Sequence, residues 1–530
     1  MATIISSSQF NPSNFAAPGV YVNNIPPAPY ISGAATNVAM VVGTASWGPL
    51  NAPQIMSTPQ DATTYFGGIN SAALTDVHDM CTDATIAFQQ GFISLYGCRV
   101  SDGTDTKASI ALDDTSTPTA LVGGTATALY SGIVGNAITV TIKASSITNY
   151  YDVTISSAIG TPDFYPRLPG TGFWNALATA LSSGILGVAA PSKYIRLVSP
   201  NSAAVAPAVG TFTLTGGTDG RSAVTSAELI GQEATFPVTG IYAAASLTPM
   251  PQKLWVAGFT DTTSVATIQS FLDQNAIYSA IALPVGTSTS TALSTINSVG
   301  VHDYNISYLK DWVYWNDTAN NVVRLVPPYG FVMGLITALA PSQSPLNKPV
   351  SGVVGTERNN PYTGSTPYSQ AEIGQLENAG VLVITNPIPQ GAVFGLATGN
   401  NTSLNTAESP VEYATMTNFL DQSFAQSLGG YVGQLQTARQ KDPVRAAVRH
   451  ELNTFLSGLQ QASLIDQVVQ LTCNFAQSGN PQLGINTPAT IAAHYLYAYA
   501  AVRYLSSVRY FVMSLNGGTT VVSSSPTAPA

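Results

Sequence analysis

The chain has 530 residues, and its 18 Lys plus Arg against 27 Asp plus Glu give a formal net charge of −9. Only 8% of the residues are charged, against about 25% in ordinary soluble proteins, which excludes a coiled coil or a disordered chain. The hydrophobic fraction of 45% is enough for a sizeable core. No charged residue precedes Asp61 and none follows Arg509, which indicates surfaces that other protein covers. The alternative is an extracellular β-rich protein whose surface is made of Ser, Thr, Asn and Gln.

The sequence contains no motif that predicts catalysis, phosphate binding or a metal site. His450-Glu451 begins a string like HExxH, but Thr454 stands where the second zinc ligand should be. No Walker, GxGxxG or GxSxG string occurs, and no Lys/Arg cluster indicates nucleic acid. We therefore expect no enzyme, no cofactor, no metal and no nucleic-acid partner. The three cysteines lack a CxxC pair and are expected to be buried thiols: Cys81, Cys98 and Cys473.

No segment has the length and apolarity of a membrane span, and we expect no secretory signal. The best candidate for a span, 491–515, contains His494, Arg503 and Arg509, so its pattern predicts an amphipathic helix instead.

The first hundred residues predict an extended arm followed by an α/β core. Residues 1–30 are uncharged and rich in proline, with one strand expected over 19–23, which contains Val20, Tyr21 and Val22. A buried strand over 38–42, a helix over 79–90 and a strand over 92–100 follow. This β-α-β order is typical of an α/β fold.

The composition shifts near residue 101 to Thr, Ser, Gly and Ala, which predicts an inserted β-rich outer domain over 101–244. Alternating apolar residues predict half-exposed strands at 137–142 and 152–155, and a helix is expected at 174–181. The glycine-rich string LTGGTDG at 214–220 is interpreted as a tight turn. The α/β core resumes at 245, with strands at 253–257, 279–285 and 381–384 and a helix at 264–274. The core is thus expected to be discontinuous, 31–100 plus 245–515.

The last third predicts three helices. Ser409-Pro-Val-Glu412 reads as a capping box for a helix that ends at Gly429-Gly430, and Asp442-Pro443 starts a second helix. A third helix is expected over 488–515. We interpret the apolar stripes of these helices as core packing. The first two stripes are Met416, Phe419, Leu420, Phe424 and Leu428, then Val444, Val448, Leu452, Phe455 and Leu459.

The chain ends in a second arm, 516–530, whose short strand is Thr519, Thr520, Val521 and Val522. A lone strand must pair with a sheet edge. If that edge belongs to another copy, the pairing builds rings or filaments. The arms could equally fold back onto their own subunit, and the sequence leaves both arrangements open.

Several strings, in this order, resemble motifs of the tail sheath proteins of contractile bacteriophages and related injection systems. They are PGVYV at 18–22, VAMVVGTASWGP at 38–49, YFG at 65–67, AFQQG at 87–91, GCRV at 97–100, YSGIVGN at 130–136, LTGGTDG at 214–220 and RLVPPYG at 324–330. Their shared order over about 300 residues makes the resemblance specific, since each string alone is weak. Gln90 and Tyr329 depart from the family pattern, and the last third matches in element order rather than in strings.

The resemblance implies a structural protein without catalysis, which forms stacked hexameric rings around a tail tube and contracts to drive the tube through the host envelope. It implies a place in the virion after assembly in the host cytoplasm, with the tube, baseplate and tail terminator or neck proteins as partners. The arms would add strands to neighbouring subunits. Glycines could absorb the changes of angle in the arms: Gly19, Gly33, Gly517 and Gly518.

In the family, the C-terminal part faces the tube, so basic residues there are candidates for tube contact: Arg439, Lys441, Arg445, Arg449, Arg503 and Arg509. Residues 402–530 hold six basic and six acidic side chains, which leaves 12 basic and 21 acidic side chains, and hence the whole charge of −9, in 1–401. The alternative is that these basic side chains are solvated or form pairs within the chain. The alternative hypothesis for the function is that the chain is another self-assembling structural protein, of a virion or a surface layer, that does not contract.

Overall fold

The computed structural model describes residues 3–6, 21–24, 31–91, 93–234, 236–476, 484–511 and 513. Its architecture is mixed α/β, as predicted, and centres on an eight-stranded sheet in the order β22-β21-β15-β14-β13-β3-β5-β4. The middle strands are parallel, and β4 and β22 are antiparallel at the two edges. The bounds are β3 Val38–Gly43, β4 Gln54–Met56, β5 Ser94–Arg99, β13 Lys253–Val256, β14 Tyr278–Ala282, β15 Ile306–Lys310, β21 Val381–Thr385 and β22 Gly395–Leu396.

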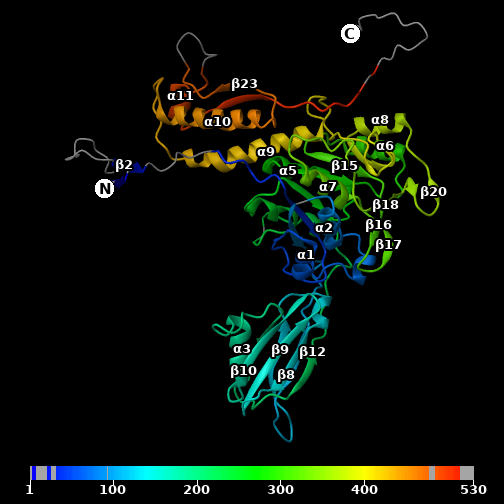
Figure 1. Cartoon of the computed structure of the whole chain (residues 1–530), viewed down its shortest axis with the longest axis vertical. Coiled ribbons are helices and arrows are strands. Elements are labelled where there is room, and N and C mark those ends of the chain that lie inside the picture. The colour runs from blue at the N-terminus through cyan, green and yellow to red at the C-terminus, as the bar shows by residue number, and fades with distance from the viewer. Residues whose placement is uncertain are drawn as a thin grey trace, which may run out of the picture.

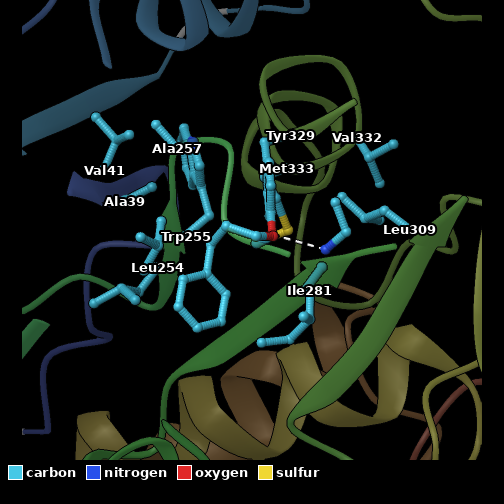
Figure 2. Packing of buried hydrophobic residues seen from close by; sticks show 14 of the residues in the cluster. Ala39, Val41, Leu254, Trp255, Ala257, Ile281, Leu309, Tyr329, Val332 and Met333 are labelled. Carbon is cyan, nitrogen blue, oxygen red and sulfur yellow. Dashed lines mark hydrogen bonds between the residues drawn. The ribbon is translucent and has the colours of Figure 1, made fainter. Parts of the chain in front are cut away.

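Helices cover this sheet because its middle strands are apolar on both faces. Helix α7, which carries Tyr329 and Met333, lies over one face above Trp255, with further helices on the opposite side (Figure 2). The Tyr329 hydroxyl accepts a hydrogen bond from the backbone N–H of Ala282 at 2.7 Å, which ties the helix to β14. The helices of this body are α1 Pro59–Phe66, α2 Met80–Phe88, α4 Ser226–Ile230, α5 Val265–Asn275, α6 Thr289–Val299, α7 Tyr329–Ala338 and α8 Gln370–Asn378.

Short elements complete the body. Three strands form a sheet in the order β17-β16-β18, and β19 pairs with β20. These strands are β16 Val313–Asp317, β17 Val322–Val326, β18 Val353–Thr356, β19 Asn359–Asn360 and β20 Gly364–Ser365. The 3-10 turns within the described residues are η3 Ser71–Leu74, η4 Ile133–Ala137, η5 Gly240–Ser246, η6 Thr262–Ser264 and η7 Gly429–Tyr431.

A second hydrophobic core forms between two antiparallel sheets and one helix. The sheets have the orders β10-β9-β8-β12 and β11-β7-β6, and the unit projects away from the body (Figure 1). Its elements are β6 Ser109–Asp113, β7 Val122–Ala128, β8 Thr139–Ala144, β9 Tyr150–Ser157, β10 Gly160–Pro169, α3 Phe173–Ser183, β11 Ile195–Val198 and β12 Gly210–Thr213. The interpretation of 214–220 as a tight turn agrees with the positive φ of Gly216 and Gly220.

The two cores do not divide the chain at the expected residues. Leu229, Ile230 and Ile241 pack in the large core, although we expected the inserted domain to continue to 244. Trp47 lies within the segment expected to belong to the large core, yet it packs in the second core against Tyr130. The chain therefore returns to the body near residue 220, about 25 residues before the expected boundary.

The last third forms a small layer of helices and strands above the body (Figure 1). Its elements are α9 Val411–Leu428, α10 Pro443–Gln461, β23 Gln467–Thr472, α11 Pro488–Ala492 and β24 Tyr499–Arg503. The second predicted helix start is confirmed, because Asp442 caps α10 by accepting from the backbone N–H of Arg445. The stripes on α9 and α10 pack as core, as interpreted, except for Val444, which is half-buried and belongs to neither cluster.

The capping box predicted at Ser409–Glu412 is wrong. Helix α9 begins at Val411 with Pro410 at its cap position and no side-chain cap. The Ser409 hydroxyl donates to the Thr406 carbonyl, and the Glu412 carboxylate accepts from the Ser507 hydroxyl instead.

The helix predicted over 488–515 is also wrong. Helix α11 ends at Ala492, and His494 then takes a positive φ of 65°. Residues 499–503 pair antiparallel with β23 as strand β24. Tyrosines at 495, 497 and 499 alternate with other residues, which is the period of a strand and not of a helix.

Candidate assembly site

The chain joins its two cores through one buried arginine. Arg99 ends β5 and is 0% exposed, and its guanidinium donates to three backbone carbonyls: Gly48 at 2.7 Å, Ser131 at 2.8 Å and Asp219 at 3.0 Å. Burial lowers the pKa of Arg99 to about 10, which is still far above neutral, so the group stays charged. The three carbonyls belong to separate segments: Gly48 precedes the second core in the chain, Ser131 lies between its strands β7 and β8, and Asp219 follows its last strand, β12. Arg99 therefore fixes the direction in which that core projects.

A glycine at the same joint cannot be replaced by a larger residue without moving the backbone. Gly132 has φ +137°, and a Cβ there would lie 2.1 Å from the carbonyl oxygen of Ser46. The backbone of the two units is thus in direct contact at this point. The motif YSGIVGN, on which the resemblance partly depends, includes this glycine.

Charged side chains surround the joint. Arg221 pairs with Asp219 at 2.8 Å and with Asp76 at 3.3 Å, and its Nη1 lies 4.0 Å from Asp79. Burial raises the pKa of Asp79 to about 6, although hydrogen bonds from Thr82 and the nearby Arg221 act in the opposite direction. This network holds the return of the chain at 219–221 against the start of α2.

The root of the N-terminal arm lies along α9. The backbone N–H groups of Ser32 and Ala34 donate to Ser427 and Ser423 at 3.1 and 2.9 Å. Between them, a Cβ on Gly33 would meet the Phe419 ring at 3.2 Å, which explains the glycine by a close approach. Two residues further, the Thr36 carbonyl accepts from the buried Lys253 ammonium at 2.9 Å, and burial lowers the pKa of Lys253 to about 7.

The strand expected over 19–23 is present as β2 Tyr21–Asn24, and it pairs in parallel with β1 Thr3–Ser6 of the same arm. Pairing with a neighbouring copy stays a prediction. Several residues predicted for the arms lie outside the described residues: Gly19, Val20, Gly517, Gly518 and the strand at 519–522.

The segment after β24 is fastened across the body without regular structure. The Tyr504 ring lies against Tyr413, with ring centroids 5.6 Å apart. The Ser507 hydroxyl donates to Glu412 at 2.6 Å, and Arg509 forms an ion pair with Glu377. The root of the C-terminal arm is therefore fixed at three points before it leaves the described part of the chain.

The six basic residues expected at the tube differ in exposure and in their partners. Arg445 is only 3% exposed and donates to the carbonyls of Thr437 and Arg439, so it does not present its charge outward. Arg503 pairs with Asp466 and Arg509 with Glu377. Arg449 is exposed and donates to Asn474 at 2.7 Å. Arg439 and Lys441 are exposed in the loop before α10.

Sequence reasoning missed the acidic side chains of this region. Glu412 and Asp421 belong to α9, and Glu377 pairs with Arg509 in the segment after β24. The sequence pattern assigned Glu412 to a capping box, and this assignment hid its contact with Ser507. Burial raises the pKa of Glu377, against the effect of Arg509.

Within the described residues, no group of three or more His, Cys, Asp or Glu side chains is arranged to hold a metal ion. A search of the same residues finds no helix with the length and hydropathy needed to cross a bilayer. The three cysteines are free and buried, as expected.

No family model matches the sequence, and no curated protein matches it. Solved structures do match. A sheath tail protein from Desulfitobacterium hafniense has a TM-score of 0.53 at 14% identity, over 86% of this chain and 92% of its own. A sheath tail protein from Listeria innocua has a TM-score of 0.54 at 13% identity, over 82% and 87%.

The helical sheath of the anti-feeding prophage, in its contracted state, has a TM-score of 0.50 at 11% identity, over 95% of this chain and 99% of its own. At such identities the likeness concerns the fold, and it extends over nearly the whole length of both chains. The expected resemblance is therefore confirmed at the level of architecture: this chain has the fold of contractile tail sheath proteins.

Proposed function

We propose that the chain is a structural subunit of a contractile tail sheath and that it has no enzymatic role. The observation that carries this proposal is the likeness of fold to sheath proteins over 82–95% of the chain, although identity is only 11–14%. The distribution of charge supports it, since both uncharged ends are suited to burial between copies. A charge on an added strand would have to leave water when neighbours seal it.

In this proposal the subunits polymerise as stacked hexameric rings around a tail tube, and contraction drives the tube through the host envelope to deliver the genome. The two cores act as rigid bodies, while the arms keep neighbours connected as the rings move. The assembly belongs to a virion and forms in the host cytoplasm. Its further partners are the tube, the baseplate and the terminator or neck proteins.

Tube contact is proposed for exposed basic side chains of the last third. Arg449 is the strongest candidate, because its side chain is exposed and forms no ion pair among the described residues, whereas Arg503 and Arg509 each pair with a carboxylate. The arm hinges remain proposed at Gly19, Gly33, Gly517 and Gly518.

The experiment is deletion of 1–30 or of 516–530, followed by sedimentation and electron microscopy. We expect folded subunits that no longer form polymer, because strand addition depends on main-chain hydrogen bonds that the deletion removes. Circular dichroism controls for folding. Polymers of normal yield from either truncated chain would contradict strand exchange, and flat lattices from the intact chain would favour a surface-layer protein.

A further inference from the structure

The loop between α9 and α10, residues 432–441, presents apolar side chains to water. Val432 is 85% exposed and Leu435 is 92% exposed. Two exposed cations follow them in the same loop, Arg439 and Lys441, and neither side chain forms an ion pair or hydrogen bond with the described residues. Exposed apolar groups beside unpaired charges are typical of a surface that meets a partner.

The chain holds this loop in a defined shape. The buried Arg445 donates to the carbonyls of Thr437, at 2.9 Å, and Arg439. The Asp442 carboxylate accepts from the backbone N–H of Thr437 at 2.6 Å, and the Gln436 amide donates to the Tyr495 carbonyl at 2.9 Å. The loop is therefore organised before any partner arrives, which reduces the entropy lost on binding.

A groove of about 710 Å³ runs along α9 from Pro410 to Phe424, between that helix and the segment after β24. Its lining is partly polar and partly apolar, and the apolar wall is formed by Met416, Leu420, Phe424, Leu464 and Val502.

Two acidic side chains that form no ion pair with the described residues lie beside this apolar wall. Glu412 is 6% exposed, and its Oε2 has no hydrogen-bond partner. Asp421 forms no ion pair or hydrogen bond with the described residues. Arg503 and Arg509 also line the groove, but each already pairs with a carboxylate. The groove thus offers apolar surface and unpaired negative charge, which complements the loop in both respects.

The loop does not fill the groove of its own chain, because none of residues 432–441 is among the residues that line it. Helix α9 has 18 residues, and at 1.5 Å per residue its ends are about 27 Å apart. The groove begins at the N-terminal end of α9, at Pro410, whereas the loop follows the C-terminal end of the helix.

We propose that loop 432–441 of one copy inserts into the α9 groove of the next copy. Val432 and Leu435 cover the apolar wall, while Arg439 and Lys441 approach Glu412 and Asp421. Because the two surfaces differ, the contact is head-to-tail and continues from copy to copy, as a ring or helix requires. This inference rests on the proposed polymerisation, and it assigns Arg439 and Lys441 to a neighbouring subunit rather than to the tube.

The test measures the lowest protein concentration at which the full chain forms sedimentable polymer. We expect Leu435→Ser, the double change Arg439→Glu with Lys441→Glu, and Asp421→Lys each to raise that concentration at least tenfold. Combining Asp421→Lys with the double change should restore much of the loss, because the charges then complement each other again.

Matched controls carry the same chemistry elsewhere. Leu186→Ser removes a fully exposed leucine on the surface of the unit that holds the second core, and Lys107→Glu with Lys143→Glu reverses two exposed lysines of the same unit. Neither control should change the concentration. Thermal unfolding of each variant confirms that the subunit is folded.

The outcomes separate this contact from the proposed function. Normal polymers from both loop variants would overturn the contact and leave the sheath proposal intact. Polymers that form normally but fail to enclose added tube protein would assign the loop to the tube instead. An intact chain that stays monomeric would overturn the proposed function, and the contact with it.

Discussion

Replacing Arg99 with alanine should weaken the joint between the two cores. The change removes the donor for the carbonyls of Gly48, Ser131 and Asp219, all in a site where Arg99 is 0% exposed. A buried carbonyl without a donor costs about 1–3 kcal/mol. Water that enters the emptied space would satisfy some of these groups, so we take the lower part of that range for three carbonyls and expect a loss of about 3–5 kcal/mol.

Urea unfolding with tryptophan fluorescence measures this loss, since both cores contain tryptophan. Limited proteolysis near 101–106 reports the joint itself, because that segment links the cores. Arg99→Lys should lie between the alanine variant and the natural chain, since it keeps the charge but not the planar fork that reaches three carbonyls.

The control is Arg196→Ala, which removes a half-buried arginine that donates to Ser192 and Ile195 within the second core. It should cost about 1 kcal/mol or less and leave the cleavage rate at 101–106 unchanged. If Arg99→Ala unfolds within about 1 kcal/mol of the natural chain and is cleaved no faster, the guanidinium does not hold the joint and the reasoning is refuted.

Three further changes test other parts of the structure. Gly123→Ala would place a Cβ 1.9 Å from the Trp174 ring and should cost about 3 kcal/mol in urea unfolding, whereas Gly103→Ala, with nothing within 4 Å, probes only the backbone strain of a positive φ. Because the pKa of Asp79 is raised to about 6, the folded state holds the proton more tightly than the unfolded state, and stability should fall by about 2 kcal/mol as pH rises from 4 to 6. Asp79→Asn keeps the helix cap and should reduce that fall. An unchanged pH profile in this variant would contradict the assignment of the fall to Asp79. Because the pKa of Lys253 is lowered to about 7, the unfolded state binds more protons than the folded state above that pH, and stability should rise from pH 7 to 9. Lys253→Met should flatten this rise, which thermal unfolding at a series of pH values would show.

The sequence predicted the parts of the fold that local patterns determine. The continuous apolar run at 38–42 became a central strand, and Asp442-Pro443 capped a helix where expected. In both cases the local pattern fits only one secondary structure, a buried strand or a capped helix, and tertiary packing favours the same structure.

Predictions failed where two patterns overlapped or where a distant residue decided the outcome. Residues 495–504 satisfy both a helical and an alternating pattern, and pairing with β23 selected the strand. Glu412 has capping chemistry, but its partner proved to be Ser507, 95 residues away. Arg445 lies among exposed cations in the sequence, and only the fold shows that it is buried under the loop that it holds.

Electron microscopy of the purified, full-length chain tests the central proposal most directly. Helical order in the images, with six-fold end views, measures both polymerisation and symmetry. We predict hollow tubes or stacked six-fold rings, because the chain combines the sheath fold with two uncharged arms. Monomers at every concentration tried, or flat lattices without tubes, would contradict it.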